Sequence, residues 1–195
     1  MKQSILFLCI LILMSCKDAK KEVQDKTQQT EIEQKTTSPI TGKKKPLSPH
    51  SSTMAMIGDA HIHIDYSSPG VRDRIIFGGL VGYSKVWQAG AHNATWIETN
   101  KELTIAGEVL PAGKYGFFTI PSKEDWTVMI NKNWEQHGKD EYDEKDDVIR
   151  FKVTPKISEN IQEHLAYKVT KTSENSGTIS MTWEKVHIEF PFTVN

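Results

Sequence analysis

The sequence predicts an all-β domain, an antiparallel β-sandwich or jelly-roll-like fold of about ten strands. Three observations favour this class. Apolar and polar residues alternate with a period of two from residue 51 onward, turn-forming residues separate the alternating stretches, and no long stretch has the period of an amphipathic helix. Many short strands with turn signals between them are typical of both sandwiches and jelly rolls, and periodicity does not distinguish the two.

Residues 1–15 have the layout of a bacterial lipoprotein signal peptide. Lys2 precedes an apolar run that ends at Met14, and the small Ser15 precedes Cys16. The run of about ten residues is too short to span a hydrocarbon core of roughly 30 Å as a permanent helix. We therefore expect cleavage before Cys16 and acylation of that cysteine. Lys17 stands where an inner-membrane retention signal typically places aspartate, so we expect an outer-membrane anchor, facing either the periplasm or the exterior.

Residues 16–46 hold this cysteine and a predicted disordered tether. Residues 17–46 contain eight lysines and five acidic residues, a net charge of +3, and no aromatic residue. Such a segment buries too little apolar surface to offset the entropy cost of ordering. The alternative is an amphipathic helix over residues 20–35, but Val23 and Ile32 do not form an apolar stripe.

Residues 47–195 are expected to form one domain. This part carries a net charge of −5 and no basic stripe, so nucleic acid is not an expected partner. Both cysteines, Cys9 and Cys16, lie at or before the acylation site. The domain therefore has no disulfide or thiolate ligand, and its hydrophobic core has to stabilise it.

The first two predicted strands, 51–57 and 60–66, flank the hairpin signal Gly58-Asp59. In the second strand, Ile62 and its apolar neighbours face one side, and His61, His63 and Asp65 face the other. Pro111-Ala112-Gly113 predicts a type I turn, and Asn175-Ser176-Gly177 predicts a tight hairpin. The other predicted strands are 94–99, 102–106, 114–120, 126–131, 147–154, 165–172, 178–184 and 186–194.

Residues 69–90 interrupt this pattern with a glycine-rich stretch that does not alternate. We expect a long connection across one end of the sandwich, with a helical turn near residues 72–76. A loop of this length in a small domain is either functional or packed by its own apolar side chains. Arg72 and Arg74, together with Trp87, are candidates for an anion or ligand pocket, and a structural role for Arg74 is the alternative.

His61 and His63 are candidate metal ligands, because residues two apart on a strand share a face. His92 is a candidate third ligand, and His187 with Glu189 is another. A transition metal is the only cofactor that the sequence suggests. The alternative is an ordinary solvated strand face. Residues 140–147 contain six carboxylates, but they lack the spacing of a dedicated calcium loop and read more readily as a solvated acidic loop.

Five tryptophans are many for a chain of this size, and most are expected in the core. Trp96 and Ile97 alternate in facing, so one of them should be less buried. Trp134 lies in polar surroundings and is the best candidate for an exposed platform on which a sugar ring could stack.

Several segments together resemble the family known as domain of unknown function 2911. The resemblance covers nearly all of residues 47–195 and implies a secreted or lipid-anchored all-β domain with no established activity. Ser68 and Gln88 stand where relatives often show arginine. The matching segments include Tyr66-Ser67-x-Pro69, Ile76-Phe77-Gly78-Gly79-Leu80, Val86-Trp87-x-x-Gly90-Ala91, Leu110-Pro111-Ala112-Gly113-x-Tyr115, Phe118-Thr119-Ile120-Pro121, Tyr142-Asp143-x-x-x-Asp147-Val148-x-Arg150 and Trp183-Glu184.

These observations favour a membrane-anchored envelope lipoprotein with a non-catalytic binding or structural β domain. The domain is read as non-catalytic because the sequence shows no nucleophile elbow, phosphate loop or zinc-protease motif. Its ligand or protein partner is expected at residues 69–91 and the nearby loop ends. A metal-binding protein or metal-dependent hydrolase that uses His61 and His63 is the alternative, and glycan binding through an exposed tryptophan is a further one.

Overall fold

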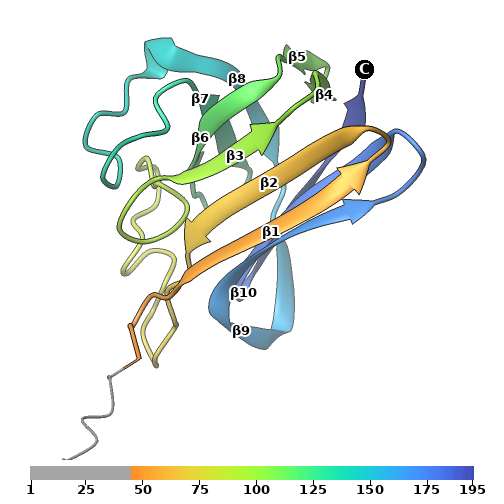
Figure 1. The fold of residues 1–195 in the computed structure, drawn as a ribbon. Coiled ribbons are helices and arrows are strands. Elements are labelled where there is room, and N and C mark those ends of the chain that lie inside the picture. Colours follow the sequence, from red (N-terminus) through yellow and green to blue (C-terminus); the bar gives the residue numbers. More distant parts are fainter. Residues whose placement is uncertain (1–44) are drawn as a thin grey trace, which may run out of the picture. The chain divides into compact units, whose positions relative to one another are not determined.

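Two antiparallel sheets form the domain in the computed structural model, which describes residues 45–195 (Figure 1). The signal peptide, Cys16 and nearly all of the predicted tether lie outside the described residues. One sheet has six strands in the order β1-β2-β3-β6-β7-β8, and the other has four in the order β5-β4-β10-β9. The strands are β1 (His50–Ile57), β2 (Ala60–Ser67), β3 (Thr95–Thr99), β4 (Leu103–Ile105), β5 (Glu108–Leu110), β6 (Gly113–Ile120), β7 (Trp126–Asn131), β8 (Asp147–Val153), β9 (Lys156–Lys171) and β10 (Ser176–Val194).

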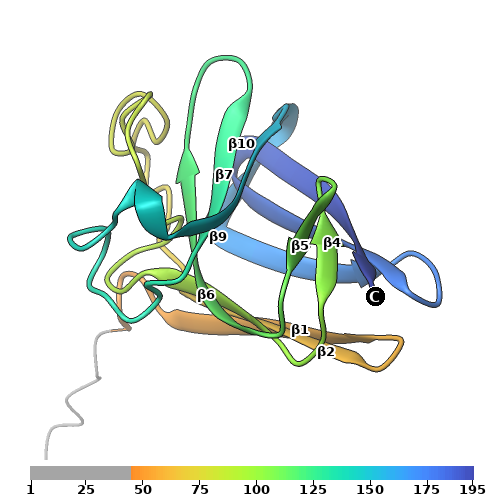
Figure 2. The ribbon, with the colours of Figure 1, turned by 90° about the horizontal axis from the view of Figure 1, so that it is seen from above.

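The two sheets face each other, which confirms the predicted sandwich-like all-β class (Figures 1 and 2). Their edges also approach each other, because β1 contacts β9 on one side and β5 contacts β8 on the other. The described part of the chain has one short 3₁₀ turn, Glu144–Asp146, and contains no helix with the length and hydropathy of a membrane span.

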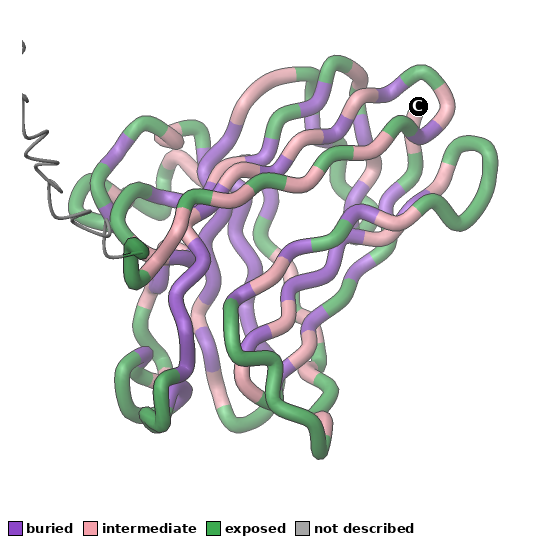
Figure 3. Tube along the Cα trace, turned by 60° about the horizontal axis from the view of Figure 1, so that its bottom comes forward, coloured by how far each residue is buried: buried purple, intermediate pink, exposed green. Residues whose placement is uncertain are grey.

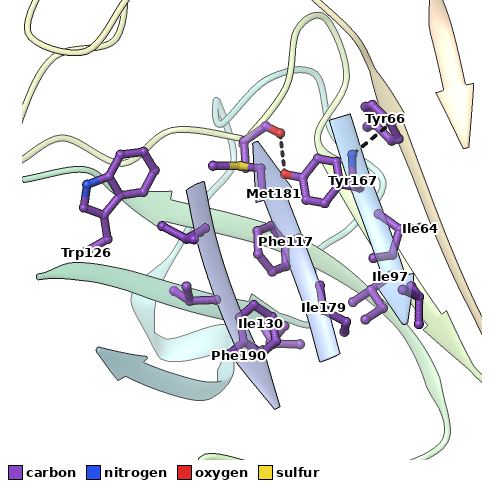
Figure 4. Close-up of a cluster of buried hydrophobic side chains, with 14 of the residues drawn as sticks. Ile64, Tyr66, Ile97, Phe117, Trp126, Ile130, Tyr167, Ile179, Met181 and Phe190 are labelled. Atoms are coloured by element: carbon purple, nitrogen blue, oxygen red, sulfur yellow. Dashed lines mark hydrogen bonds between the residues drawn. The ribbon is translucent and has the colours of Figure 1, made fainter. Parts of the chain in front are cut away.

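The core lies between the two sheets and follows the alternation seen in the sequence. In β2 each apolar residue is buried and each polar residue is partly exposed, as predicted for Ile62 and His61. Buried and more exposed residues also alternate elsewhere along the trace in Figure 3, whereas β7 is buried along its whole length and β6 at residues 115–119. Figure 4 shows Ile64, Ile97, Phe117 and Ile130 of the larger sheet packed against Ile179, Met181 and Phe190 of the smaller one. Full burial of such a side chain stabilises the fold by about 1.5–3 kcal/mol.

Seven of the predicted strands have a close counterpart, and the differences concern β5, β9 and β10. The predictions omitted β5, whose three residues pair with β4. The predicted strands 178–184 and 186–194 form one strand, β10, in which the pairing with β9 shifts register on both sides of Glu184. Glu184 has a φ of 53°, a bulge conformation that keeps the strand continuous where the sequence pattern changes phase. β9 begins at Lys156, and its mostly exposed first half was not predicted.

The predicted turns between strands are present. Ile57 pairs with Ala60 around a two-residue turn, and Gly58 has a φ of 60° there, as a type II′ turn requires. Residues 172–175 connect β9 to β10, with Thr172 N–H donating to the Ser176 carbonyl at 2.9 Å. These turns set the register that places one face of each strand in the core.

Residues 68–94 form the expected long connection, but the predicted helical turn near residues 72–76 is wrong. The N–H of Arg74 donates to the carbonyl of Val71 across a turn whose central residues, Arg72 and Asp73, have φ values of 48° and 56°. Both lie in the left-handed region, which a right-handed helical turn excludes. This connection also contains Ser84, Ala89 and His92 with positive φ, so it holds five of the seven such non-glycine residues in the described part of the chain.

Candidate functional site

The connection 68–94 borders a cavity of about 410 Å³, which we call the loop pocket. Trp183 of β10 comes from the core, Lys139 comes from the loop between β7 and β8, and the other lining residues belong to the connection itself. The lining residues are Pro69, Leu80, Val81, Gly82, Lys85, Val86, Trp87, Gln88, Gly90, Ala91, His92, Lys139 and Trp183. The pocket therefore lies in the stretch that the sequence predicted as the ligand site.

Two stacked indoles form the apolar floor of the loop pocket. The rings of Trp87 and Trp183 have centroids 5.7 Å apart and an interplanar angle of 24°. The ring of Phe77 packs edge-on against both indoles, and its centroid lies 5.9 Å from that of Trp87 and 6.0 Å from that of Trp183. The backbone of Trp87 exchanges two hydrogen bonds with Thr119 of β6, and its indole N–H donates to the Gly90 carbonyl at 3.0 Å. Trp87 is thus fixed in place at the boundary between the core and the pocket.

The indole N–H of Trp183 has no hydrogen-bond partner among the residues that the structure describes. Trp183 is 1% exposed and lines the loop pocket. A buried donor without an acceptor costs about 1–3 kcal/mol, so nearly all such groups in proteins are paired with protein, water or ligand. A hydrogen-bond acceptor that reached this N–H would remove that cost.

The rim of the loop pocket is cationic. Lys85 and Lys139 line it, both are exposed, and none of the described lining residues is a carboxylate. Gln88 also lines it. Two lysines on a rim whose lining includes no carboxylate attract a negatively charged group, and the low-dielectric indole floor reduces the screening of that attraction.

The strained backbone beside the pocket is held by several hydrogen bonds. Ala89 has a φ of 52°, and its carbonyl accepts from the hydroxyl of Tyr167 at 2.6 Å and that of Thr95 at 3.0 Å. The dashed line from the Tyr167 hydroxyl in Figure 4 marks the first of these bonds. Burial raises the pKa of Tyr167 well above its usual value, so this donor keeps its proton. Strain that the surroundings fix in this way is characteristic of binding sites.

Trp87 lines the loop pocket, whereas Arg72 and Arg74 are not among its lining residues. Arg74 donates to the carbonyls of Val71 at 3.1 Å and Gly70 at 2.7 Å, the structural role that was its alternative. Arg72 donates through its guanidinium to the Leu47 carbonyl at 3.2 Å. Arg72 and Asp73 form the left-handed turn that precedes Arg74. Lys85 and Lys139 supply the positive charge instead.

The structure does not bring together the candidate metal ligands. His61 and His63 share the outer face of β2, with ring centroids 6.2 Å apart, whereas His92 lies on the rim of the loop pocket. His187 belongs to the other sheet, where it contacts the hydroxyl of Thr182 at 2.7 Å. Residues 45–195 contain no group of three or more His, Cys, Asp or Glu side chains arranged to hold a metal ion.

Trp134 lies in a second cavity of about 390 Å³ on the outer face of the six-stranded sheet, the sheet-face cleft. The alternation predicted that one residue of the pair Trp96 and Ile97 would be less buried, and the structure shows that it is Trp96, which lies in this cleft with Trp134. The lining residues are His50, Asp65, Tyr66, Ser67, Asn93, Ala94, Trp96, Trp134, Glu135, Gln136 and His137.

A short backbone contact separates the two cavities. Residues 92–94 pair with residues 136–138 through hydrogen bonds from Gly138 N–H to the His92 carbonyl, 2.7 Å, and from Ala94 N–H to the Gln136 carbonyl, 3.0 Å. His92 lines the loop pocket, and Asn93 and Ala94 line the cleft. The loop between β7 and β8 thus contributes to both sites.

The acidic residues 140–147 form a folded cover for a small second apolar cluster, built around Phe118 and Met129. Asp147 accepts from Tyr142 at 2.8 Å, Asn131 at 2.8 Å and Arg150 at 3.1 Å. Burial and the bond to Asp147 raise the pKa of Tyr142 far above its usual value. Asp147, the carboxylate of this segment with the most hydrogen-bond partners, therefore holds the loop in place.

Sequence reasoning missed three residues of the loop pocket. Trp183 reads as an ordinary core tryptophan, and the missing partner of its N–H is visible only in the folded chain. Lys85 and Lys139 lie 54 positions apart in polar surroundings, so no local pattern marks them as neighbours of one cavity. The one available signal was that Trp87 and Trp183 both belong to the segments that carry the family resemblance.

Comparisons with known proteins give a family and no nearer relative. No curated protein and no solved structure matches the chain. A family model matches residues 48–192, which include every strand except part of β10 and all residues that line the two cavities. The chain therefore belongs to the family described as protein of unknown function (DUF2911).

Proposed function

We propose that this protein is an envelope lipoprotein, anchored through Cys16 to the outer membrane, whose β domain binds a small ligand at the loop pocket without catalysing a reaction. The observation that carries the binding role is the unpartnered indole N–H of Trp183 on a pocket with a stacked-indole floor. The leader sequence that ends at Cys16 supports the anchor.

The chemistry of the loop pocket favours a ligand that is flat and apolar at one end and acidic at the other. The stacked indoles offer an apolar surface, the Trp183 N–H offers a donor, and Lys85 and Lys139 offer positive charge. Apolar walls with a few convergent polar groups are the usual composition of small-molecule sites. An arylacetic acid has both required parts and is a suitable probe.

Calorimetric titration of the full-length lipidated protein with phenylacetate, indole-3-acetate and the corresponding neutral amides tests this proposal. We expect the acids to bind at least about tenfold more tightly than the amides, a difference of about 1.4 kcal/mol. The double variant Lys85→Met/Lys139→Met should abolish this difference between acid and amide. Trp183→Phe, which keeps a ring in the core and removes the N–H donor, should weaken the binding of both.

Lys168→Met is the matched control, since Lys168 is an exposed lysine on β9 that does not line the pocket. Equal affinity for acids and amides, or an acid preference that survives the double lysine variant, would contradict the proposed site. Hydrolysis of envelope glycans or esters by the purified protein would contradict the non-catalytic role.

A further inference from the structure

The sheet-face cleft places an indole beside a carboxylate on adjacent strands. Trp96 of β3 is the direct cross-strand neighbour of Asp65 of β2 and of Gly116 of β6. Cross-strand neighbours on one face have Cβ atoms about 4.5–5.5 Å apart. Gly116 has no side chain, and the ring of Phe118 and the carbonyl of Asn133 fill the space where its Cβ would lie. An apolar ring and a hydrogen-bonding carboxylate are therefore presented together to the cleft.

The two tryptophans of the cleft are held in a fixed arrangement. Trp96 and Trp134 have ring centroids 6.4 Å apart and an interplanar angle of 67°. The ammonium group of Lys114 lies 3.6 Å from the centroid of Trp96 and 3.7 Å from that of Trp134. Each such contact contributes about 0.5–1 kcal/mol at an exposed site. Lys114 therefore orders both rings before any ligand arrives, and it occupies the position between them where a ligand cation would bind.

The lining of the cleft carries two carboxylates, and Lys114, which is not among the lining residues, lies between the two indole rings. The carboxylates are those of Asp65 and Glu135, and none of the described lining residues is lysine or arginine. Asp65 is 19% exposed at its side chain and pairs with His50, with 2.7 Å between the carboxylate and the imidazole Nε2. Carboxylates accept hydrogen bonds from hydroxyl groups, and Asn93 adds an amide that donates and accepts. The loop pocket has the opposite lining, with lysines and no carboxylate among its described lining residues.

From these contacts we propose that the sheet-face cleft is a second binding site, specific for neutral saccharides. A sugar ring has an apolar C–H face that stacks on an indole, and its hydroxyl groups at the ring edge donate to carboxylates. The cleft offers both, with Trp134 as the stacking surface and Asp65 as the acceptor. Trp96 lies beside Trp134, in contact with Lys114 and His63. Lys114 is a positioning residue, which acts by holding the two rings. This site is independent of the loop pocket and of its proposed acidic ligand.

The test is a titration of the full-length lipidated protein with four- to six-unit oligomers of glucose, mannose, galactose and N-acetylglucosamine. The protein is kept in a detergent without a sugar headgroup, which would otherwise compete for the cleft. Polygalacturonate and choline represent anionic and cationic ligands. We expect saturable binding of at least one neutral oligomer, and affinity at least about tenfold lower in both Trp134→Ala and Asp65→Asn.

Conservative and control variants separate recognition from folding. Trp134→Phe keeps a stacking ring and should retain most of the affinity, and Lys114→Met should reduce affinity while changing the tryptophan emission spectrum. Glu124→Gln and Lys123→Met alter exposed charges outside the cleft and should bind like the unaltered protein. The proposal is overturned if the folded protein binds none of the neutral oligomers, if it prefers polygalacturonate or choline, or if Trp134→Ala and Asp65→Asn, with unchanged melting temperatures, bind normally.

Discussion

Tyr142 and Tyr167 show how a single buried hydroxyl can fix a functional surface. Tyr167 holds the strained carbonyl of Ala89 beside the loop pocket. Tyr142 packs on Phe118, with ring centroids 5.0 Å apart, and donates to Asp147, which ties down the loop between β7 and β8. Both phenols have raised pKa values because folding removes them from water. Each hydroxyl therefore acts as a donor only while it keeps its proton.

The protein should lose stability in alkali because of these two tyrosines. An unfolded tyrosine loses its proton near pH 10, whereas the folded one keeps it, so the stabilisation is full below pH 10 and decreases as the pH rises further. Each tyrosine contributes a slope of up to about 1.4 kcal/mol per pH unit. The free energy of unfolding, measured with urea at pH 9, 10 and 11, should decrease with pH less steeply in Tyr142→Phe than in the unaltered protein. The difference in this pH slope should be up to the amount given above.

Asn131→Ala is the control for this measurement. Asn131 donates to Asp147 and to the carbonyl of Asp143 in the same network, but it does not titrate. Its loss should lower the free energy of unfolding equally at all three pH values. If the free energy of unfolding decreases with pH equally in the unaltered protein and in Tyr142→Phe, Tyr142 ionises at the same pH in the folded and unfolded states. That result would contradict the prediction.

At the scale of elements, the main departure from a regular pattern is the bulge in β10. Glu184 adopts a left-handed φ within a strand, with register shifts on both sides. The bulge lets Trp183 and Val186 both be buried, although strict alternation would expose one of them. A local irregularity in the backbone therefore places the indole that floors the loop pocket.

The left-handed φ predicts the relative stability of two variants at Glu184. An L-residue in this conformation is strained by about 1–2 kcal/mol, and glycine is not. Glu184→Gly should therefore be more stable than Glu184→Ala, by about 1 kcal/mol in urea unfolding. At Lys185, which has no positive φ, the order should reverse, with glycine less stable than alanine by about 0.5–1 kcal/mol. Glycine less stable than alanine at both positions would show that the bulge is not strained.

At the scale of the whole molecule, the two cavities lie on either side of one backbone contact, residues 92–94 against 136–138. One cavity has a cationic rim over stacked indoles, and the other has carboxylates beside a lysine-ordered pair of indoles. The loop between β7 and β8 contributes Lys139 to the first and Trp134 to the second. A single domain can thus offer two sites with different ligand chemistry.

The proposed anchor is a property of the entire chain. We expect the native protein to fractionate with outer membranes and to have a mature N-terminus at an acylated Cys16, since two or more acyl chains give stable anchoring. Mass spectrometry of the N-terminal peptide and detergent phase partitioning measure this. Cys16→Ala should prevent acylation, and Cys9→Ala is the matched control that should leave it unchanged. Native protein that retains Met1 and carries no acyl chain would contradict the anchor.

The sequence predicted most of the strands because each strand buries one face, and burial of one face imposes a period of two. Hairpin turns were predictable for a related reason, since few residues accept the conformation at Gly58. The β5 strand was missed because three residues are too few to show a period. The β10 bulge was missed because a change of phase looks the same as the end of one strand and the start of another.

The sites were less predictable than the fold. The sequence alone determined the fold class, the location of the ligand-site candidate in residues 69–91, and the partial exposure of one residue of the Trp96–Ile97 pair. Only the tertiary structure decided that Arg74 binds backbone carbonyls, that His92 lies apart from His61 and His63, and that Trp183 has an unpartnered N–H. The physical reason is that alternation depends on near neighbours in the chain, whereas hydrogen-bond partners and cavity walls come from residues that only folding brings together.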